Sequence, residues 1–444
     1  MLETLRRRVQ GKKVLLLGYG REGKSTLRLL RQAGGYAALA IADRAQLAGE
    51  ELADAYLYSG ENYQAHLADY DVIFKSPGIV LEYADDDTIS RVTSQTELFL
   101  ERYRRQIIGV TGTKGKSTTA TLLYHALSQN GVDCVLAGNI GIPAFDMADK
   151  MGEHTLVVYE MSCHQLEYTR VSPHIAIFLN LYEEHLDHYG TFERYAAAKY
   201  NIYRYQTGED VLICRADCVP TEYPGRVISF ARQGEARSEV DYTDALIRWG
   251  ANTFSVPVDE ITLSGGHNVA NITAAYAAAA LVGVGWEPFC SALRTYQALP
   301  HRLQQIGEVE GVRYYDDSIS TICESAIQAM RSLPNIGSVL IGGMERGIDY
   351  TPLEKALCTA PVRHIILMYD TGKRIEKELF ERFPDVAKEH TVHVVEDLEQ
   401  AVALAKRVTP KGSCCLLSPA AASYGFFRNF EERGEVFAKL VLQK

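Results

Sequence analysis

Short apolar runs alternate with stretches of helical periodicity along most of the chain. The runs are rich in Val, Ile and Leu, which is typical of strands buried on both faces of a sheet. Because helical stretches separate them, the pattern predicts an α/β protein built on parallel sheets. The clearest predicted strands are residues 13–17, 38–43, 71–75, 107–111, 155–159, 175–179, 338–341, 364–367, 392–395 and 414–417.

The predicted strands fall into three blocks. At roughly 150 residues per domain, a chain of 444 residues has room for about three domains. We expect these to be residues 1–94, 95–299 and 300–444. Within the second block, the turn-rich stretch 214–263 predicts a small antiparallel appendage, and the Ala-rich run 274–286 predicts a tightly packed helix.

Charge and composition exclude several classes of partner. The chain has 46 Lys and Arg against 56 Asp and Glu, a formal net charge of −10, which argues against a nucleic acid or an anionic membrane held by bulk attraction. The apolar run 274–286 is shorter than the roughly 18 residues that suggest a membrane span. No signal peptide is recognisable. We expect a cytoplasmic protein with no membrane span, whose nine cysteines are reduced thiols.

Two glycine-rich loops follow predicted strands. The first, Gly18-Tyr-Gly20-Arg-Glu-Gly23, fits the GxGxxG pattern of a Rossmann-like domain, and Asp43 ends the next strand, where a ribose acceptor would lie. Residues 18–25 also fit the GxxxxGK[ST] pattern. Two interpretations therefore stay open: a dinucleotide site, or a helix-packing turn with Lys24 at the surface.

The second loop, residues 109–118, misses the strict pattern because position 110 is Val. Its mechanics nevertheless favour it for ATP, since glycines flank a tight turn, a lysine reaches the terminal phosphates, and hydroxyls can bind Mg²⁺. The expected ATP-binding residues of this loop are Gly112, Thr113, Gly115, Lys116, Ser117 and Thr118.

Three residues downstream are candidates for work on a phosphoryl group. Glu160 directly follows a predicted strand, as a carboxylate that places Mg²⁺ would. His185 follows the next strand, and Lys199 lies on an apolar helix face. Taken singly, each is more often an ordinary loop residue, a satisfied histidine or a snorkelling lysine.

Taken together, the motifs resemble the Mur ligase family over essentially the whole chain. The central glycine loop and His267-Asn-Val-Ala-Asn271 are shared with the wider family, which includes folylpolyglutamate synthetase. The closing segments 418–423 and 429–434 resemble the branch that adds D-glutamate. The other matching segments are 18–23, 76–79, 138–141, 160–167, 184–187, 198–199, 300–302, 316–318, 342–343 and 346–347.

The resemblance implies a fold and a reaction. The N-terminal Rossmann-like domain would bind a UDP-sugar, the central P-loop domain ATP, and the C-terminal Rossmann-like domain an amino acid. ATP would phosphorylate the L-alanyl carboxylate of UDP-N-acetylmuramoyl-L-alanine. The amine of D-glutamate would then attack the acyl phosphate to give an amide, ADP and phosphate. We expect a monomer.

The resemblance also implies roles for individual residues. Ser117, Glu160, His185 and Lys199 would place two Mg²⁺ ions, with Lys199 carrying a carbamate. Lys116 would neutralise the transferring phosphoryl group. ATP would further meet Asn271, Arg302 and Asp317. The UDP-sugar would meet Gly20, Arg21, Glu22, Asp43, Arg44, Gly78, Asn139 and Ser162. D-glutamate would meet Thr321, Arg346, Ser423 and Phe430.

Some positions depart from the family pattern. Lys114 stands where Asn is frequent, Cys163-His164 where Ser-Phe is common, and Ile319 where some members have a Lys that pairs with a D-glutamate carboxylate. Arg346 must then carry more of that charge. The alternatives are a sister ligase adding L-alanine, a diamino acid or polyglutamate, a nicotinamide-dependent dehydrogenase, and a non-catalytic nucleotide-binding regulator.

Overall fold

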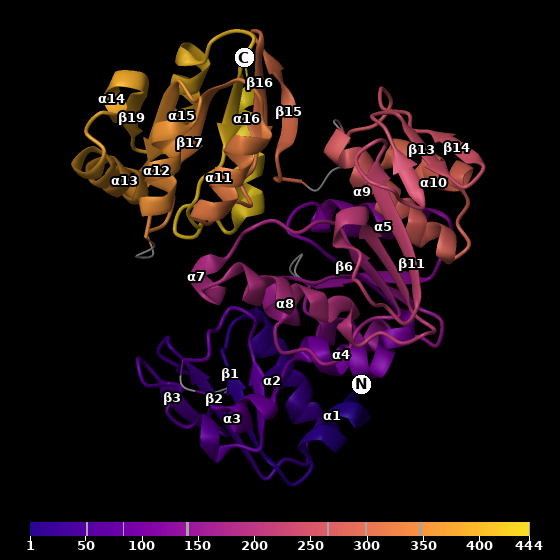
Figure 1. Ribbon diagram of the computed structural model, residues 1–444. Coiled ribbons are helices and arrows are strands. Elements are labelled where there is room, and N and C mark those ends of the chain that lie inside the picture. Colours follow the sequence, from indigo (N-terminus) through magenta and orange to yellow (C-terminus); the bar gives the residue numbers. More distant parts are fainter. Residues whose placement is uncertain are drawn as a thin grey trace. The chain divides into compact units, whose positions relative to one another are not determined.

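The computed structural model describes residues 1–49, 52–82, 84–138, 142–263, 266–297, 300–345 and 349–443 (Figure 1). Its contacts divide the chain into two compact units, Met1–Tyr296 and Gln297–Lys444. Three sheets, each mainly parallel, confirm the predicted α/β class. The boundary between the units lies next to the one predicted at residue 300.

The first unit begins with a five-stranded parallel sheet, which matches the Rossmann-like prediction for the N-terminal block. Two strands at its edges, β3 and β5, were not predicted from the hydrophobic pattern. In spatial order the strands are β3 (Tyr56–Ser59), β2 (Ala38–Asp43), β1 (Lys13–Leu17), β4 (Val72–Lys75) and β5 (Val92–Thr93).

A nine-stranded sheet forms the centre of the first unit. Its last three strands in spatial order are joined by antiparallel pairings, and these form the predicted antiparallel appendage. The spatial order is β7 (Cys134–Gly138), β8 (Leu156–Glu160), β6 (Ile107–Thr111), β9 (Ile175–Phe178), β10 (Val211–Arg215), β11 (Arg226–Arg232), β12 (Val240–Tyr242), β13 (Leu246–Trp249) and β14 (Asn252–Ser255).

The second unit contains a six-stranded sheet. An antiparallel pair, β15 and β16, stands at one edge, and the other pairings are parallel. The spatial order is β15 (Gln304–Val309), β16 (Val312–Asp316), β20 (Cys414–Leu417), β17 (Ile336–Ile341), β18 (His364–Met368) and β19 (Thr391–Val395).

Helices connect the strands. Those of the first unit are α1 (Leu2–Val9), α2 (Arg21–Ala33), α3 (Asp86–Ser90), α4 (Gln95–Tyr103), α5 (Lys116–Gln129), α6 (Cys163–Leu166), α7 (Leu186–Tyr189), α8 (Phe192–Arg204), α9 (Gly266–Leu281) and α10 (Trp286–Thr295). Those of the second are α11 (Cys323–Ser332), α12 (Thr351–Thr359), α13 (Tyr369–Arg382), α14 (Val386–Glu389), α15 (Leu398–Val408) and α16 (Phe430–Leu442). Short 3₁₀ turns occupy Leu67–Asp69, Arg104–Gln106, Ala144–Lys150 and Ala216–Cys218.

The two faces of the central sheet bury different partners. One face packs on α5, α9 and α10, and Ala274, Ala275 and Ala278 of the Ala-rich run are fully covered there. The run is not one helix as predicted, because α9 ends at Leu281 and α10 begins at Trp286. The other face packs on α4 and shares one continuous apolar cluster with the N-terminal block, in which Phe74 of β4 joins Phe178 of β9. This shared core is why residues 1–296 form a single unit.

The cysteines are free thiols, as expected. Cys414 and Cys415 are both buried in β20 and belong to different apolar clusters. They therefore face opposite sides of the sheet, as neighbouring residues of a strand do.

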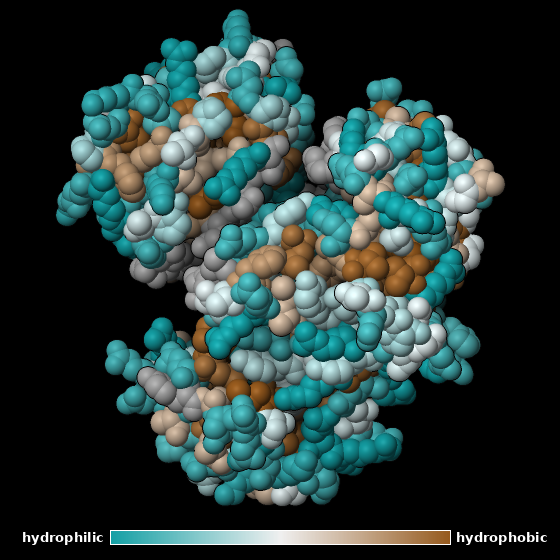
Figure 2. Space-filling model, viewed as in Figure 1, coloured by the Kyte–Doolittle hydropathy of each residue, from teal (hydrophilic) through white to brown (hydrophobic). Residues whose placement is uncertain are grey.

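The surface seen in Figure 2 is mostly hydrophilic, with smaller apolar areas between. Some large apolar side chains are exposed, among them Tyr56 on β3 and Tyr424. Within the described part of the chain, every helix is too short or too polar to cross a membrane.

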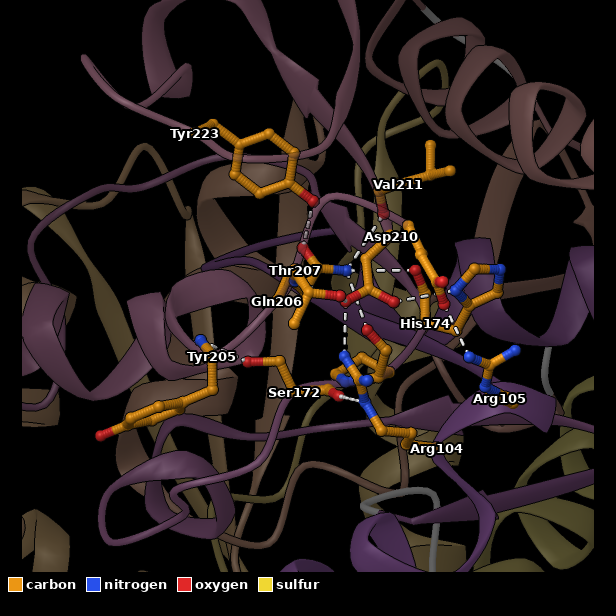
Figure 3. Close-up of polar contacts among 12 residues, drawn as sticks. Arg104, Arg105, Ser172, His174, Tyr205, Gln206, Thr207, Asp210, Val211 and Tyr223 are labelled. Carbon is orange, nitrogen blue, oxygen red and sulfur yellow. Dashed lines mark hydrogen bonds and ion pairs between the residues drawn. The ribbon is translucent and has the colours of Figure 1, made fainter.

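A buried polar network ties together the amino-terminal ends of the central strands (Figure 3). Asp210, which precedes β10, is 2% exposed. It accepts hydrogen bonds from the Thr207 amide at 2.6 Å and from His174 Nδ1 at 2.9 Å, and it pairs with Arg104. Burial alone would raise the pKa of Asp210, but the hydrogen bonds from His174 and Thr207 and the Arg104 charge outweigh it and lower the pKa.

We predict that Asp210→Asn lowers the free energy of unfolding by about 1–3 kcal/mol at pH 7, because it leaves buried donors without their charged acceptor. A carboxylate whose pKa is lowered by folding stabilises above its unfolded pKa, near 3.9, and that contribution is lost as the pH falls through the folded pKa. Urea unfolding of the two proteins should therefore converge in acid.

The exposed Asp259→Asn serves as the matched control and should change stability by less than about 0.5 kcal/mol. A deficit of Asp210→Asn that is the same at every pH would contradict the charge-based account.

Candidate functional site

The central glycine loop joins β6 to α5 through two glycines with positive φ, Gly112 at 154° and Gly115 at 83°. A Cβ at Gly115 would overlap the side-chain oxygen of Asn271, and a Cβ at Gly112 would lie 2.9 Å from the Cβ of Leu179. Only glycine fits either position. The same crowding places Asn271, a predicted ATP contact on α9, directly against the loop.

Asn180, just after β9, hydrogen-bonds the loop on both sides of Lys114. Its Oδ1 accepts from the Lys114 amide at 2.8 Å, and its Nδ2 donates to the Lys114 carbonyl at 3.0 Å. The Thr113 amide donates to the Asn180 carbonyl at 3.0 Å. Sequence analysis gave Asn180 no role, although its place directly after a buried strand was a usable signal.

Thr113, another predicted loop residue, is buried and anchors the loop through its side chain. Its hydroxyl lies 2.9 Å from the hydroxyl of Tyr195 and accepts from the Tyr182 amide at 2.9 Å. Ser117 and Thr118, the expected Mg²⁺ hydroxyls, lie in the first turn of α5, where Ser117 is buried.

Two lysine amines donate to carbonyls of the loop. Lys116 Nζ donates to Thr113 at 3.0 Å, and Lys199 Nζ donates to Gly112 at 2.7 Å. Burial lowers the pKa of both amines, and for Lys199, which is 1% exposed, burial and the Lys116 charge bring the pKa to about 7. The apolar helix face thus directs Lys199 inward to the loop instead of to the surface.

Acidic residues surround these amines. Glu160 ends β8 and is 1% exposed, and its charge acts on both Lys116 and Lys199. Glu184 forms an ion pair with Lys114, the residue that departs from the family pattern. The buried charges of this region therefore partly compensate one another.

His185 joins the same group with an unusual backbone conformation, at φ 57°. Burial, together with the neighbouring charges of His164, Lys199 and Lys116, lowers the pKa of His185 to about 4 against the opposing charge of Glu184. At neutral pH the imidazole is uncharged, which is the form that binds a metal ion.

The predicted Mg²⁺ residues combine different donor types. Among the described residues, no three His, Cys, Asp or Glu side chains gather as a metal site would require. Ser117 and Glu160 are buried oxygen donors of the kind Mg²⁺ prefers. The amine of Lys199 would repel a cation, so this set fits Mg²⁺ once Lys199 has lost its positive charge.

The N-terminal loop is a tight packing turn with one open position. A Cβ at Gly18 would lie 2.7 Å from Ser76 and Ile79, and a Cβ at Gly23 would overlap the Gly18 carbonyl, whereas Gly20 has free space around it. The second glycine of this pattern is the one that a phosphate approaches. The predicted contact Gly20 therefore has room for a ligand.

Asp43 and Lys24 differ in how they contact the N-terminal glycine loop. The Asp43 carboxylate accepts from the Tyr19 amide at 2.7 Å and from the Ala45 amide at 2.8 Å. Through the first of these bonds it fixes the loop. Lys24 is exposed, with its amine 5.5 Å from the centre of the Tyr19 ring. This surface position is the one that the helix-packing interpretation expects for Lys24.

Other predicted UDP-sugar residues differ in exposure. Arg21, Arg44 and Gly78 are exposed. Ser162 caps α6, and its hydroxyl accepts from the Gln165 amide at 3.2 Å. Glu22 accepts from Gln165 Nε2 at 2.8 Å, and burial raises its pKa, so its carboxylate connects the N-terminal block to α6. Asn139 lies outside the described residues.

In the second unit, Asp317 is buried and accepts hydrogen bonds from two other segments of the unit. It accepts from the Leu303 amide at 3.2 Å and from the Ser418 hydroxyl at 2.7 Å, and burial raises its pKa to about 6. Arg302 beside it is exposed.

The residues of this unit that were predicted to bind the amino acid differ in burial and position. Ser423 is buried, Phe430 begins α16, and Thr321 is half-buried. Arg346 lies outside the described residues.

Arg433 lies in the closing segment 429–434, where no role was predicted for it. It is fully buried and donates to the hydroxyl and carbonyl of Ser318, at 2.9 and 2.8 Å, and to the Ala421 carbonyl at 3.0 Å. It thereby joins the segments that carry Asp317 and Ser423. A charged residue this deeply buried could not be recognised from its sequence position on a helix.

Comparisons with known proteins agree with this arrangement. Residues 110–279 match the Mur ligase middle domain. A UDP-N-acetylmuramoylalanine–D-glutamate ligase of Symbiobacterium thermophilum is 34% identical over 399 residues, 87% of each chain. One of Acetivibrio thermocellus is 32% identical over 99% of this chain and 98% of its own.

Solved structures support the fold. MurF ligase from Thermotoga maritima in complex with ADP is similar at a TM-score of 0.54, with 19% identity over 99% of both chains. The UDP-N-acetylmuramate-alanine ligase MurC of Thermotoga maritima gives a TM-score of 0.53, with 19% identity over 96% of this chain and 98% of its own.

These relatives decide against the dehydrogenase and the non-catalytic regulator as interpretations of the glycine loops. The extent and level of identity place the chain beside enzymes of one named activity. The chain belongs to the Mur ligase family, in the group of the UDP-N-acetylmuramoylalanine–D-glutamate ligases.

Proposed function

We propose that the chain joins UDP-N-acetylmuramoyl-L-alanine to D-glutamate at the expense of ATP. A phosphoryl group passes from ATP to the L-alanyl carboxylate, the D-glutamate amine attacks the acyl phosphate, and the products are the amide, ADP and phosphate. The names of the relatives support the two substrates to be joined. The observation that supports the ATP step is the central glycine loop, whose carbonyls accept hydrogen bonds from the amines of Lys116 and Lys199.

ATP would bind the central glycine loop at the start of α5. The amides at the start of α5 and the helix dipole favour phosphate. Lys116 would supply a positive charge next to the phosphates, from an amine that donates to the Thr113 carbonyl at 3.0 Å. Asn271 lies against Gly115 and is positioned to contact the same nucleotide. In the second unit we assign Arg302 and Asp317 to ATP.

Ser117, Glu160 and His185 would hold Mg²⁺ at two sites, together with Lys199 in a modified form. When bound, the ions would neutralise charge on the transferring phosphoryl group. A neutral imidazole and a buried carboxylate suit this task at physiological pH.

Lys199 would act as a carbamate. Its ammonium group first loses a proton to solvent, and the neutral nitrogen then adds to the carbon of CO₂ and releases a second proton to solvent. A cation thereby becomes an anion with two oxygen donors. The remaining N–H can still donate to the Gly112 carbonyl, which now accepts from this nitrogen at 2.7 Å. The modification would also remove the repulsion between the buried amines of Lys199 and Lys116.

The remaining assignments follow the family resemblance. We assign the UDP-sugar to Gly20, Arg21, Asp43, Arg44, Gly78, Asn139 and Ser162, with Glu22 supporting them from within. D-glutamate is assigned to Thr321, Arg346, Ser423 and Phe430. We also propose that the reaction takes place in the cytoplasm and that one chain suffices for it.

The substrate assignment is tested by phosphate release with UDP-N-acetylmuramoyl-L-alanine, ATP and a panel of D- and L-amino acids. We expect release with D-glutamate to exceed release with each other amino acid. The panel must include L-glutamate, because Ile319 removes a charge that some members use to hold the amino acid. Release with L-alanine and the unextended UDP-sugar would instead identify a sister ligase.

Assignment of ATP to the central loop predicts different effects of two lysines. Lys116→Ala should reduce kcat by about 100-fold or more, since it removes a charge that stabilises the transferring phosphoryl group. Lys24→Ala, an exposed residue of the other glycine loop, is the matched control and should keep most of the activity. The opposite ranking in the same assay would overturn the assignment.

The carbamate predicts chemical rescue. Lys199→Ala should lose most activity and regain part of it in acetate or formate, because a small carboxylate can occupy the place of the carbamate. The unmodified protein should show no such activation by these salts. If saturating carboxylate restores nothing to a variant that is folded by circular dichroism, Lys199 is not carbamylated in the working enzyme.

A further inference from the structure

A buried lysine of the N-terminal block has no role in the reaction described above. Lys75 ends β4, and its side chain is 3% exposed. The amine donates to the carbonyls of Pro77 at 3.1 Å and Ser76 at 3.4 Å. Lys75 thus holds the two residues that precede Gly78, the proposed contact for the UDP end of the substrate.

The turn held by Lys75 packs on the first glycine loop. The Ser76 hydroxyl donates to the Gly18 carbonyl at 3.0 Å, and the Ser76 amide donates to the Leu17 carbonyl at 2.8 Å. Any displacement of the turn would therefore also shift the loop that contains Gly20. The amine of Lys75 consequently supports Gly20 and Gly78, two proposed contacts of the UDP end.

The counter-charge of Lys75 comes from the central part of the same unit. Glu167 directly follows α6, and its Oε2 lies 3.6 Å from the Lys75 amine. The same oxygen accepts a hydrogen bond from His188 Nε2 at 3.1 Å. Tyr168 covers the amine from another side, with its ring centre 5.1 Å away.

Burying the charged amine of Lys75 costs free energy, because the amine loses its contacts with water. Burial lowers the pKa of Lys75, and Glu167 and Glu22 act against that shift. An apolar side chain of similar length would avoid the cost. The network therefore has a use that apolar packing would not provide, namely a directed bond to two carbonyls of an exposed turn.

We propose that Lys75, Glu167 and His188 form a positioning network for the UDP-sugar. It fixes the Ser76–Gly78 turn relative to α6, which directly follows Ser162, and to α7, which directly follows His185. Lys75, Pro77, His164 and Gln165 are among the residues that line a small hollow, partly open to solvent. The proposal rests on the proposed function.

The test measures KM and kcat of Lys75→Met and Glu167→Gln for each of the three substrates. Both variants should raise KM for UDP-N-acetylmuramoyl-L-alanine by about 10-fold, a change of about 1.4 kcal/mol, and leave KM for ATP within 2-fold and kcat within about 3-fold. A general loss of folding would not give this split. Lys24→Met is the matched control and should leave every constant unchanged.

The double variant should be no worse than Lys75→Met alone, because the two residues act through one turn. Equal losses in KM for all substrates, or an unchanged KM for the UDP-sugar in both variants, would overturn the proposal. If Lys75→Met does not fold, Glu167→Gln, which keeps the side-chain shape, decides by the same criteria.

Calorimetric binding of UDP-N-acetylmuramoyl-L-alanine separates this proposal from the proposed function. Wild-type protein that binds the UDP-sugar without ligating D-glutamate would contradict the proposed reaction, while weaker binding by both variants would still support the network. Equal binding by wild type and variants, or no binding by the wild type, would overturn the network.

Discussion

The backbone at Gly115 lies so close to the Asn271 side chain that no residue with a Cβ can stand there. Together with Gly112, which is packed against Leu179, this contact determines the path of the chain from β6 into α5. The start of α5 in turn places Lys116 and Ser117. Elements far apart in sequence, β6, β9 and α9, thus meet in one loop, and the proposed chemistry depends on that meeting.

The core explains why the N-terminal and central sheets act as one unit. A single apolar cluster runs from Leu16 and Phe74 of the first sheet to Phe178 of the second. Polar bonds cross the same junction, among them Gln165 to Glu22. The residues proposed for the UDP-sugar and those of the central loop therefore share one packed body, whereas the second unit has apolar clusters of its own.

Sequence reasoning succeeded where a local pattern determines the local structure. Buried strands such as 107–111 and 414–417 were found from their apolar runs, and the two glycine loops from spacing. Edge strands with mixed polarity, such as β3, were missed because half-exposed residues give a weak signal.

The site was harder to foresee than the fold, because polar side chains choose partners that are distant in sequence. Glu22, for example, accepts a hydrogen bond from Gln165, far from it in the sequence. Asn180 and Arg433 support the loops around them, and of the two only Asn180, directly after a buried strand, had a signal in the sequence. The proposed ligand contacts themselves remain predictions, since they depend on molecules that bring their own shape and charge.

Asn180 has a consequence for the thermodynamics of nucleotide binding. Its three hydrogen bonds to Thr113 and Lys114 are made within the protein, so the conformational entropy of the loop is lost during folding. A nucleotide then meets a rigid receptor and loses little affinity to ordering it. Weakening the Asn180 contacts would make nucleotide affinity more strongly dependent on temperature while leaving every phosphate-binding group in place.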